Sequence, residues 1–161
     1  KFGGLDKKGI YLDETVMRMC FTHRRIMAKL AIELLLEEEF DKAEEVLRYL
    51  DKQIPAYNVP HNYSSGSMDI ARAWALLENE KQAMTVLKDM WKNSSQYLRW
   101  YISLSSDRME MSQPECYLHF YVLQQVLAVA QDVDPKWAES RVKQLSALMD
   151  EYEAKGGKLG Y

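Results

Sequence analysis

The chain has 161 residues, of which 47% are hydrophobic and 28% charged, and its formal net charge is −3. A chain of this length buries a core without disulfide or metal cross-links. Its 7 glycines and 4 prolines are too few for a disordered chain or a many-turned β fold. The slightly negative charge gives no field that would hold a phosphate backbone, so we expect no nucleic-acid partner. No segment reaches the roughly 18 uninterrupted apolar residues of a membrane span.

Residues 1–12 are glycine-rich and alternate charged with isolated apolar side chains, which predicts an extended arm. Asp13 is a candidate N-cap for a long helix over residues 14–38. The apolar side chains of this helix recur at helical spacing, at Val16, Met17, Cys20, Met27, Leu30, Ala31, Leu34 and Leu35. Because the chain begins at Lys1 without a methionine or a signal-peptide core, we expect it to be a piece of a longer protein.

A second helix is expected over residues 40–54. Its buried stripe would comprise Phe40, Ala43, Val46, Leu47 and Leu50. Pro55, which cannot donate a backbone hydrogen bond, would end it. Residues 55–66, PAYNVPHNYSSG, have no helical period and are rich in Pro, Asn and Ser, so they predict a loop.

Two helices follow this loop, over residues 67–77 with Ser67 as N-cap and over residues 80–92. Ser94 or Ser95 would then start a separate short helix. Residues 105–113, SSDRMEMSQ, predict a second loop.

The last two helices have the clearest start signals. Ser112 followed by Glu115 is a capping-box pattern for a helix over residues 114–131. Asp134, followed by a proline, would cap a final helix that ends near Ala154. We therefore expect three segments, which are an arm (1–12), one helical domain (13–154) and a tail (155–161).

Positions 40 residues apart repeat the same kind of side chain through the first half of the chain. Met27, Leu30, Ala31, Leu34, Phe40, Ala43, Leu47, Leu50 and Pro55 are followed at this distance by Ser67, Ile70, Ala71, Trp74, Glu80, Ala83, Leu87, Met90 and Ser95. Most pairs place an apolar residue opposite an apolar residue. A fixed period of this length is typical of helical-repeat proteins, in which antiparallel helix pairs stack on one another.

The helix, tight turn, helix arrangement resembles the tetratricopeptide repeat (TPR) over residues 24–95 and, more loosely, over residues 119–150. The sequence departs from that pattern at Ser67 and Glu80. The resemblance implies an all-α fold of about six to seven helices, with antiparallel pairs stacked as a TPR-like α–α superhelix.

Two longer runs resemble a second family. GGLDKKGIYLDETVMRMCFTHRR (Gly3–Arg25) and IPAYNVPHNYSSGSMDIARA (Ile54–Ala73) are similar to the soluble C-terminal region of a bacterial family of large multi-pass membrane proteins. That family is of unknown function and is related to protein O-mannosyltransferases. The resemblance implies an accessory domain that carries no transfer chemistry, because such enzymes place their catalytic carboxylates in the membrane portion. It also implies attachment through a missing N-terminal part, on the periplasmic side or alternatively in the cytoplasm.

His61, Asn62 and Tyr63 are the candidate binding residues of the 55–66 loop, because together they offer a donor, an acceptor and a stacking surface. We favour the alternative that the loop's polar side chains satisfy its own backbone. A hydrolytic triad of His61, Ser65 and Asp69 is not expected, because no Gly-x-Ser-x-Gly elbow surrounds the serine.

If the repeat analogy holds, the first helices of the pairs line a concave face. This face would display Ile32, Leu35, Leu36, Arg72, Ala75, Leu76, Phe120, Leu123 and Leu127. Leu36, Arg72, Leu76 and Leu123 are therefore predicted to bind a partner's peptide or helix. An equally weighted alternative is that the helix pairs close into a bundle without a groove.

Three further groups of residues have ordinary explanations. Tyr97, Trp100 and Tyr101 would suit a sugar-stacking platform or a membrane-interface belt, but their helical spacing favours the core. Cys20 and Cys116 are expected to be buried thiols, with a disulfide as the alternative. The histidines lack metal-ligand spacing, so we expect no metal, no cofactor and no catalytic residue.

Arg18, Thr22 and Arg25 share one face of the first predicted helix, and Arg24 and Lys29 are nearby. Such a group would grip an acidic partner or lipid headgroup, but we favour internal pairing with the acidic run of residues 37–39.

The leading functional hypothesis is a non-catalytic TPR-like interaction or scaffolding domain of a membrane-anchored, glycosyltransferase-like protein. Its partner would be a protein or the parent's own membrane portion. One alternative is an accessory site for carbohydrate or lipid-linked sugar around residues 55–66, and another is an autonomous peptide-binding adaptor.

Overall fold

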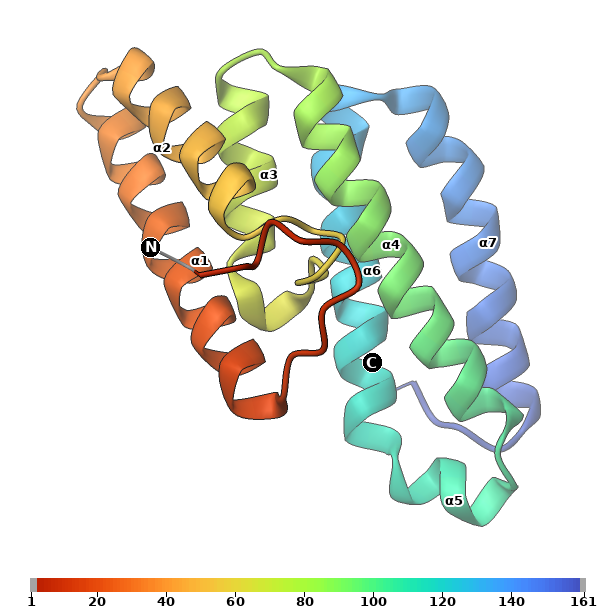
Figure 1. Ribbon diagram of the computed structural model, residues 1–161. Coiled ribbons are helices and arrows are strands. Elements are labelled where there is room, and N and C mark those ends of the chain that lie inside the picture. The colour runs from red at the N-terminus through yellow and green to blue at the C-terminus, as the bar shows by residue number, and fades with distance from the viewer. Residues whose placement is uncertain (1–2, 160–161) are drawn as a thin grey trace. The chain divides into compact units, whose positions relative to one another are not determined.

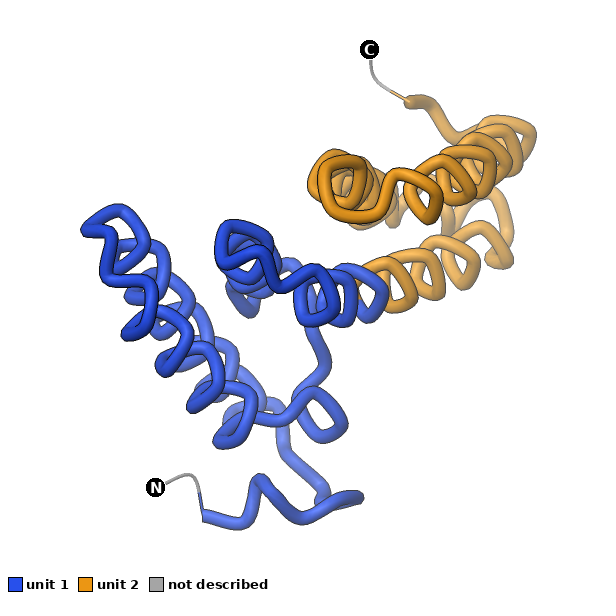
Figure 2. The backbone as a smooth tube through the Cα atoms, turned by 90° about the horizontal axis from the view of Figure 1, so that it is seen from above, with its two compact units in different colours: residues 1–89 blue, residues 90–161 orange. Residues whose placement is uncertain are grey.

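A computed structural model describes residues 3–159, which form seven α-helices, one short 3₁₀ helix and no strand. The predicted all-α class and number of helices are confirmed (Figure 1). Residues 1, 2, 160 and 161, at the ends of the expected arm and tail, lie outside the described part. The chain divides into two compact units, and the boundary along the sequence lies between Asp89 and Met90 (Figure 2).

The first unit, referred to as unit 1, contains α1 (Glu14–Leu36), α2 (Phe40–Gln53), α3 (Ser67–Leu76) and the beginning of α4 (Glu80–Ser103). α1 and α2 lie side by side and run in opposite directions, and α1 also packs against α3 (Figure 1). A 3₁₀ helix, η1 (Tyr63–Ser65), contacts both α1 and α3.

The turns after α1 and α3 are built alike, 40 residues apart. Each contains a glutamate in the left-handed region, Glu38 with φ 60° and Glu78 with φ 55°. After each of these, the next amide donates back to a carbonyl in the preceding helix, over 2.8 Å in the first turn and 2.9 Å in the second. This backbone pattern is the usual left-handed end of a helix. The internal repeat seen in the sequence is therefore present in the backbone of unit 1.

The repeated small residues let the helices of unit 1 approach closely. Ala43 and Ala83 follow the two turns, Ala31 and Ala71 precede them, and all four are fully buried. Trp74 is also fully buried, on the last full turn of α3. Because a buried methyl group takes little space, alanines at these positions allow the paired helices to pack closely.

The start of α3 differs from the prediction. Gly66, with φ 71°, precedes the helix, and the Ser67 side chain makes no cap hydrogen bond. Ser67 is instead fully buried. The predicted N-cap was wrong because the left-handed glycine already sets the direction of the chain into the helix.

α4 is one continuous helix through the predicted break. Ser94 and Ser95 lie inside it and are buried, and the Ser95 hydroxyl donates to the Lys92 carbonyl over 3.1 Å. A serine can lie in the interior of a helix when its hydroxyl donates to a carbonyl of the preceding turn. The separate short helix predicted after residue 92 was therefore wrong.

The second unit, unit 2, contains the remainder of α4, α5 (Ser106–Met111), α6 (Gln113–Val133) and α7 (Pro135–Ala154). α6 and α7 form an antiparallel pair (Figure 1). The indole rings of Trp91 on α4 and Trp137 on α7 pack edge to face, with their centroids 5.7 Å apart.

Both helix starts predicted in unit 2 are confirmed, since α6 begins directly after Ser112 and α7 directly after Asp134, but only one of the two predicted cap hydrogen bonds is present. Asp134 caps α7 through a 3.0 Å hydrogen bond from the Trp137 amide, as predicted. Ser112 makes no cap bond, because its hydroxyl donates to the Arg108 carbonyl of α5. The predicted loop over residues 105–113 was wrong, because the helix α5 occupies most of this segment.

No helix within residues 3–159 is both long enough and apolar enough to cross a membrane.

Gly66 is a position where an added side chain would collide with the backbone of a neighbouring helix. A Cβ there would lie 2.7 Å from the Arg25 Cα, a backbone atom that cannot move aside, whereas a Cβ on Gly156 meets nothing within 4 Å. Both glycines have positive φ, so both alanine variants carry similar conformational strain. We expect Gly66→Ala to lower the free energy of unfolding by about 1–3 kcal/mol more than Gly156→Ala does, as measured by urea denaturation. Equal losses in the two variants would contradict this packing.

Candidate functional site

The best-defined polar site of unit 1 is a buried guanidinium. Arg24, on α1, is 1% exposed. Its Nη2 atom donates to the carbonyls of Ile54, over 2.9 Å, and Val59, over 2.6 Å. Its Nη1 atom donates to the Pro60 carbonyl over 3.1 Å. One side chain thus satisfies three backbone acceptors of the segment that leads out of α2.

The basic residues of this helix were expected either to contact a partner at the surface or to pair with the acidic residues 37–39. For Arg24 both expectations were wrong, because it is buried and bonds to backbone carbonyls. It lies on the buried stripe of α1, one helical turn from Cys20 and one from Ala28. Burial lowers the pKa of Arg24 to about 10, while Asp51 and Asp89 nearby raise it. It therefore stays charged at neutral pH. Its i, i+4 spacing between small apolar residues was the sequence signal for burial.

His61 is joined to the start of α3 by a chain of hydrogen bonds. Its Nδ1 atom lies 2.8 Å from the Ser67 hydroxyl, which lies 2.6 Å from the Ser65 hydroxyl. The His61 backbone amide donates to the Asp89 carboxylate over 3.0 Å. His61 is 5% exposed, and the two serines are fully buried. The loop is therefore folded around its own polar groups.

The other loop residues have local contacts. The Asn62 side chain accepts from the Ser64 amide over 2.9 Å and caps η1. Tyr63 is about half exposed. Asn58 holds the N-terminal arm, because its amide nitrogen donates to the carbonyls of Leu5, over 2.7 Å, and Lys7, over 2.6 Å. The described part of the arm is thus held against the loop by the Asn58 side chain.

The predicted groove residues have different environments. Leu36 and Leu76, at the ends of α1 and α3, are 74% and 65% exposed. Arg72, one helical turn before Leu76, lies 3.8 Å from Asp69 in a half-exposed ion pair. Leu123, on α6 of unit 2, is fully buried. Thus Leu36, Arg72 and Leu76 lie on adjacent helices of unit 1, and Leu123 belongs to the core of unit 2.

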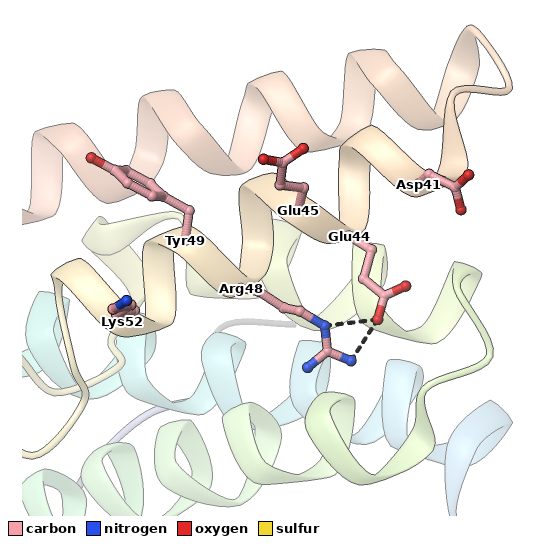
Figure 3. A pocket seen from close by; sticks show the side chains of 6 residues that line it. All are labelled: Asp41, Glu44, Glu45, Arg48, Tyr49 and Lys52. Carbon is pink, nitrogen blue, oxygen red and sulfur yellow. Dashed lines mark hydrogen bonds and ion pairs between the residues drawn. The ribbon is translucent and has the colours of Figure 1, made fainter.

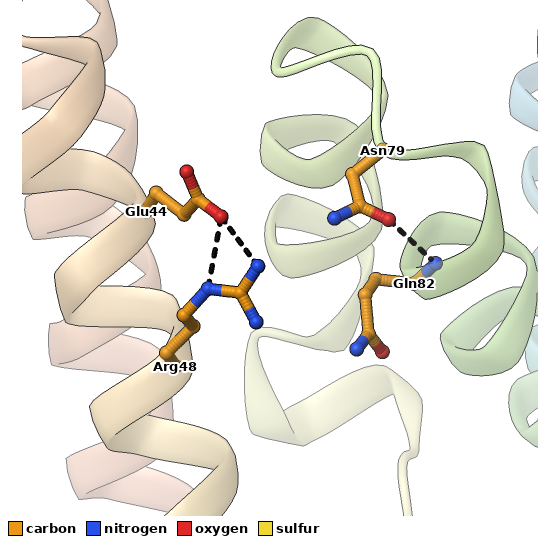
Figure 4. A network of polar contacts seen from close by, with 4 residues as sticks. All are labelled: Glu44, Arg48, Asn79 and Gln82. Atoms are coloured by element: carbon orange, nitrogen blue, oxygen red, sulfur yellow. Dashed lines mark hydrogen bonds and ion pairs between the residues drawn. The ribbon is translucent and has the colours of Figure 1, made fainter.

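A shallow hollow of about 500 Å³ lies on the outer face of α2 (Figure 3). Six residues line it, namely Asp41, Glu44, Glu45, Arg48, Tyr49 and Lys52. Arg48 donates to Glu44 over 2.8 and 2.5 Å, and its guanidinium lies 5.6 Å from the Trp74 ring centroid. Figure 4 shows this pair beside the start of α4, where the Asn79 side chain accepts from the Gln82 amide. These contacts are those of a solvated helix face.

The aromatic residues of α4 were predicted to be core, and that prediction was wrong for two of them. Tyr97 and Trp100 are each 54% exposed, whereas Leu98 between them is fully buried. Tyr101 is partly buried. Residue spacing alone placed the aromatic pair on one face, but α4 turns that face outward and buries Leu98 and Ile102 instead.

Cys20 and Cys116 are free thiols, and both are buried as predicted. Burial raises the pKa of each, that of Cys116 to about 11, so neither is activated as a nucleophile. Within residues 3–159, no three His, Cys, Asp or Glu side chains gather closely enough to hold a metal ion.

No protein-family model matches the chain, and no curated protein or solved structure is significantly similar to it.

Replacing Arg24 tests its role directly. Arg24→Met would leave the carbonyls of Ile54, Val59 and Pro60 buried without their donor, so we expect the free energy of unfolding to fall by about 3 kcal/mol. The matched control is Arg18→Met, on the exposed side of the same helix, for which a change below about 0.5 kcal/mol is expected. Similar losses in both variants, measured by urea denaturation, would refute the proposed role.

The pH dependence of stability reports on His61. Its burial, together with the nearby Arg24, lowers its pKa to about 3 in the folded chain, from an ordinary value of 6.5. Below pH 6.5 the unfolded chain therefore binds a proton that the folded chain does not, and stability falls as the pH decreases from 6.5 towards 3.

The variant His61→Gln removes this contribution. We expect its unfolding free energy to depend less steeply on pH between 6 and 4 than that of the unmodified chain, by up to about 1.4 kcal/mol per pH unit. Parallel curves for the two proteins would show that His61 titrates normally in the folded state.

Proposed function

We propose that this chain is a non-catalytic, TPR-like interaction domain in which the α1–α3 face of unit 1 binds an apolar segment of a partner protein. This face is defined by Leu36, Arg72 and Leu76. The observation that carries the proposal is the exposure of Leu36 and Leu76, which occupy equivalent positions 40 residues apart and are 74% and 65% exposed.

The repeated architecture of unit 1 supports this proposal. The pair α1–α2 and the pair formed by α3 and the start of α4 share the same left-handed turn and the same buried alanines. Stacked helix pairs of this kind present their first helices on one concave side, where repeat proteins bind their partners. The stacking of the whole chain as a superhelix is part of the proposal.

The energy of such binding would come from the leucines. Covering apolar surface is worth about 25 cal/mol per Å², and a fully covered leucine about 1.5–3 kcal/mol before ordering costs. The Arg72–Asp69 pair beside Leu76 is half exposed, so it would add orientation at the rim of the contact more than affinity.

A non-catalytic role agrees with the buried polar groups. The Ser67 hydroxyl and the His61 ring lie within hydrogen-bonding distance, which is the arrangement of a nucleophile and its base. Both side chains are buried, however, and a substrate cannot reach a fully buried hydroxyl. Their contact therefore orders the loop.

The partner we propose is the membrane portion of a longer, glycosyltransferase-like parent protein, with this domain on its periplasmic side. The two family-like runs, Gly3–Arg25 and Ile54–Ala73, support this choice. An autonomous adaptor that captures a soluble peptide is the alternative. The complete gene product distinguishes them, because several membrane spans upstream favour the first and a short open reading frame favours the second.

Photocrosslinking tests the proposed face. A photoreactive residue placed at Leu76 in the full-length protein should crosslink to one apolar segment. The same residue at Val142, which is 52% exposed on α7, should give no such product. A synthetic peptide of that segment should bind the chain, and Leu36→Asp or Leu76→Asp should weaken its binding at least about tenfold.

Both leucines are exposed, so these substitutions should leave the unfolding free energy within about 0.5 kcal/mol of its original value. Crosslinks that are equally frequent at Leu76 and Val142, or peptide binding that survives both aspartate variants, would contradict the proposal.

A further inference from the structure

A second exposed surface lies on α4 in unit 2 and does not belong to the α1–α3 face. Asn93, Gln96, Tyr97 and Trp100 follow the spacing i, i+3, i+4 and i+7, so they lie on one side of the helix. They line a hollow of about 380 Å³. This volume is near the lower end of the roughly 300–1,000 Å³ found for small-molecule sites. We refer to these four residues as the α4 platform.

The aromatic rings of the platform are held in place from below. The Tyr97 ring stacks on the His119 ring of α6, with centroids 4.9 Å apart and an angle of 9° between the planes. Trp100 packs against Tyr101, with centroids 4.8 Å apart. One face of the Tyr97 ring is thus supported by His119, whereas the Trp100 ring makes a tilted contact with Tyr101, at 58° between the planes; Tyr97 and Trp100 each remain 54% exposed. Rings fixed in this way lose little entropy when a ligand covers them.

The chemistry of the platform is uncharged. Its four residues include two exposed aromatic rings and the Gln96 side-chain amide, which can both donate and accept hydrogen bonds. Burial lowers the pKa of His119, which favours its neutral form beneath Tyr97. An ionic ligand would therefore find no opposite charge on these four side chains.

A pyranose ring matches these features. One of its faces carries C–H groups, which pack favourably against the electron-rich face of an aromatic ring. Its edge carries neighbouring hydroxyl groups, which one amide can bind by donating to one and accepting from the next. A shallow, rigid and uncharged surface with an aromatic face beside an amide is suited to a neutral sugar.

We propose that the α4 platform binds a neutral saccharide, with a pyranose stacked on Trp100 and in contact with Tyr97, and its hydroxyl groups bound by the Gln96 amide. This site is separate from the 55–66 loop, where the candidate His61 is buried. It is also independent of the proposed α1–α3 face, because no residue is shared between the two. Failure of one proposal therefore leaves the other unaffected.

Tryptophan signals provide a direct assay on the complete chain. Of the four tryptophans, Trp74 and Trp91 are 0% and 5% exposed, Trp137 is partly buried and Trp100 is 54% exposed, so the indole resonance of Trp100 is the specific signal. The probes are the methyl glycosides of glucose, mannose and galactose, and a linear trisaccharide of each. We expect titration to shift the Trp100 indole resonance and its fluorescence, with a dissociation constant on the order of 1 mM for the best monosaccharide and tighter binding for its trisaccharide.

Variants identify the residues responsible. Trp100→Ala and Tyr97→Ala should each weaken binding at least about tenfold, and Trp100→Phe should weaken it less because a ring remains. Gln96→Ala should change the preference among the three sugars. The matched control is Tyr121→Ala, which removes a 58% exposed tyrosine from α6 and should leave saccharide binding unchanged.

Three outcomes would overturn the proposal. The first is that none of the six saccharides perturbs Trp100. The second is that binding persists at full strength in Trp100→Ala, or is lost equally in Tyr121→Ala. The third is that a proline-rich peptide shifts the Trp100 signals while the saccharides do not, which would identify the platform as a peptide site.

Discussion

The buried guanidinium of Arg24 is the contact on which the arrangement of unit 1 depends. A charged group that is 1% exposed is costly unless every donor is used, and here it bonds to carbonyls on Ile54, Val59 and Pro60. These bonds fix the end of α2 and the following loop against α1. With the loop in place, His61 reaches Ser67 at the start of α3. The second helix pair is therefore connected to the first through buried polar contacts as well as through alanine packing.

The polar residues of the loop and several apolar residues of the surface have the reverse of their usual exposure. His61, Ser65 and Ser67 are buried and satisfy one another, which leaves little for a ligand to bind. Leu36, Leu76 and Trp100 remain exposed although such side chains are normally covered. Where exposed apolar side chains form a contiguous patch, they are a common mark of a binding surface. Both proposed surfaces follow from that contrast.

The sequence predicted much of the fold because helix boundaries depend on local signals. Asp13 and Asp134 cap their helices as expected, and the 40-residue repeat appears as two matching turns. Ser112 occupies the N-cap position of α6 as expected, but its hydroxyl donates to the Arg108 carbonyl of α5 and makes no cap bond. Burial was harder to predict, because the face that a helix buries is decided by its neighbours. Periodicity therefore grouped Tyr97 with Trp100 correctly and still assigned them to the wrong side of α4.

Hydrogen exchange of the 55–66 backbone amides, compared between the unmodified chain and Arg24→Met, tests the central role of Arg24 most directly. Because the guanidinium holds the loop from its carbonyl side, amides such as that of Val59, which donates to Pro55 over 3.0 Å, should be well protected in the unmodified chain. In Arg24→Met they should exchange much faster, while amides in the middle of α6 and α7 keep their protection. Unchanged protection of the loop in Arg24→Met would contradict the account, because it would show that the segment is held in place without the guanidinium.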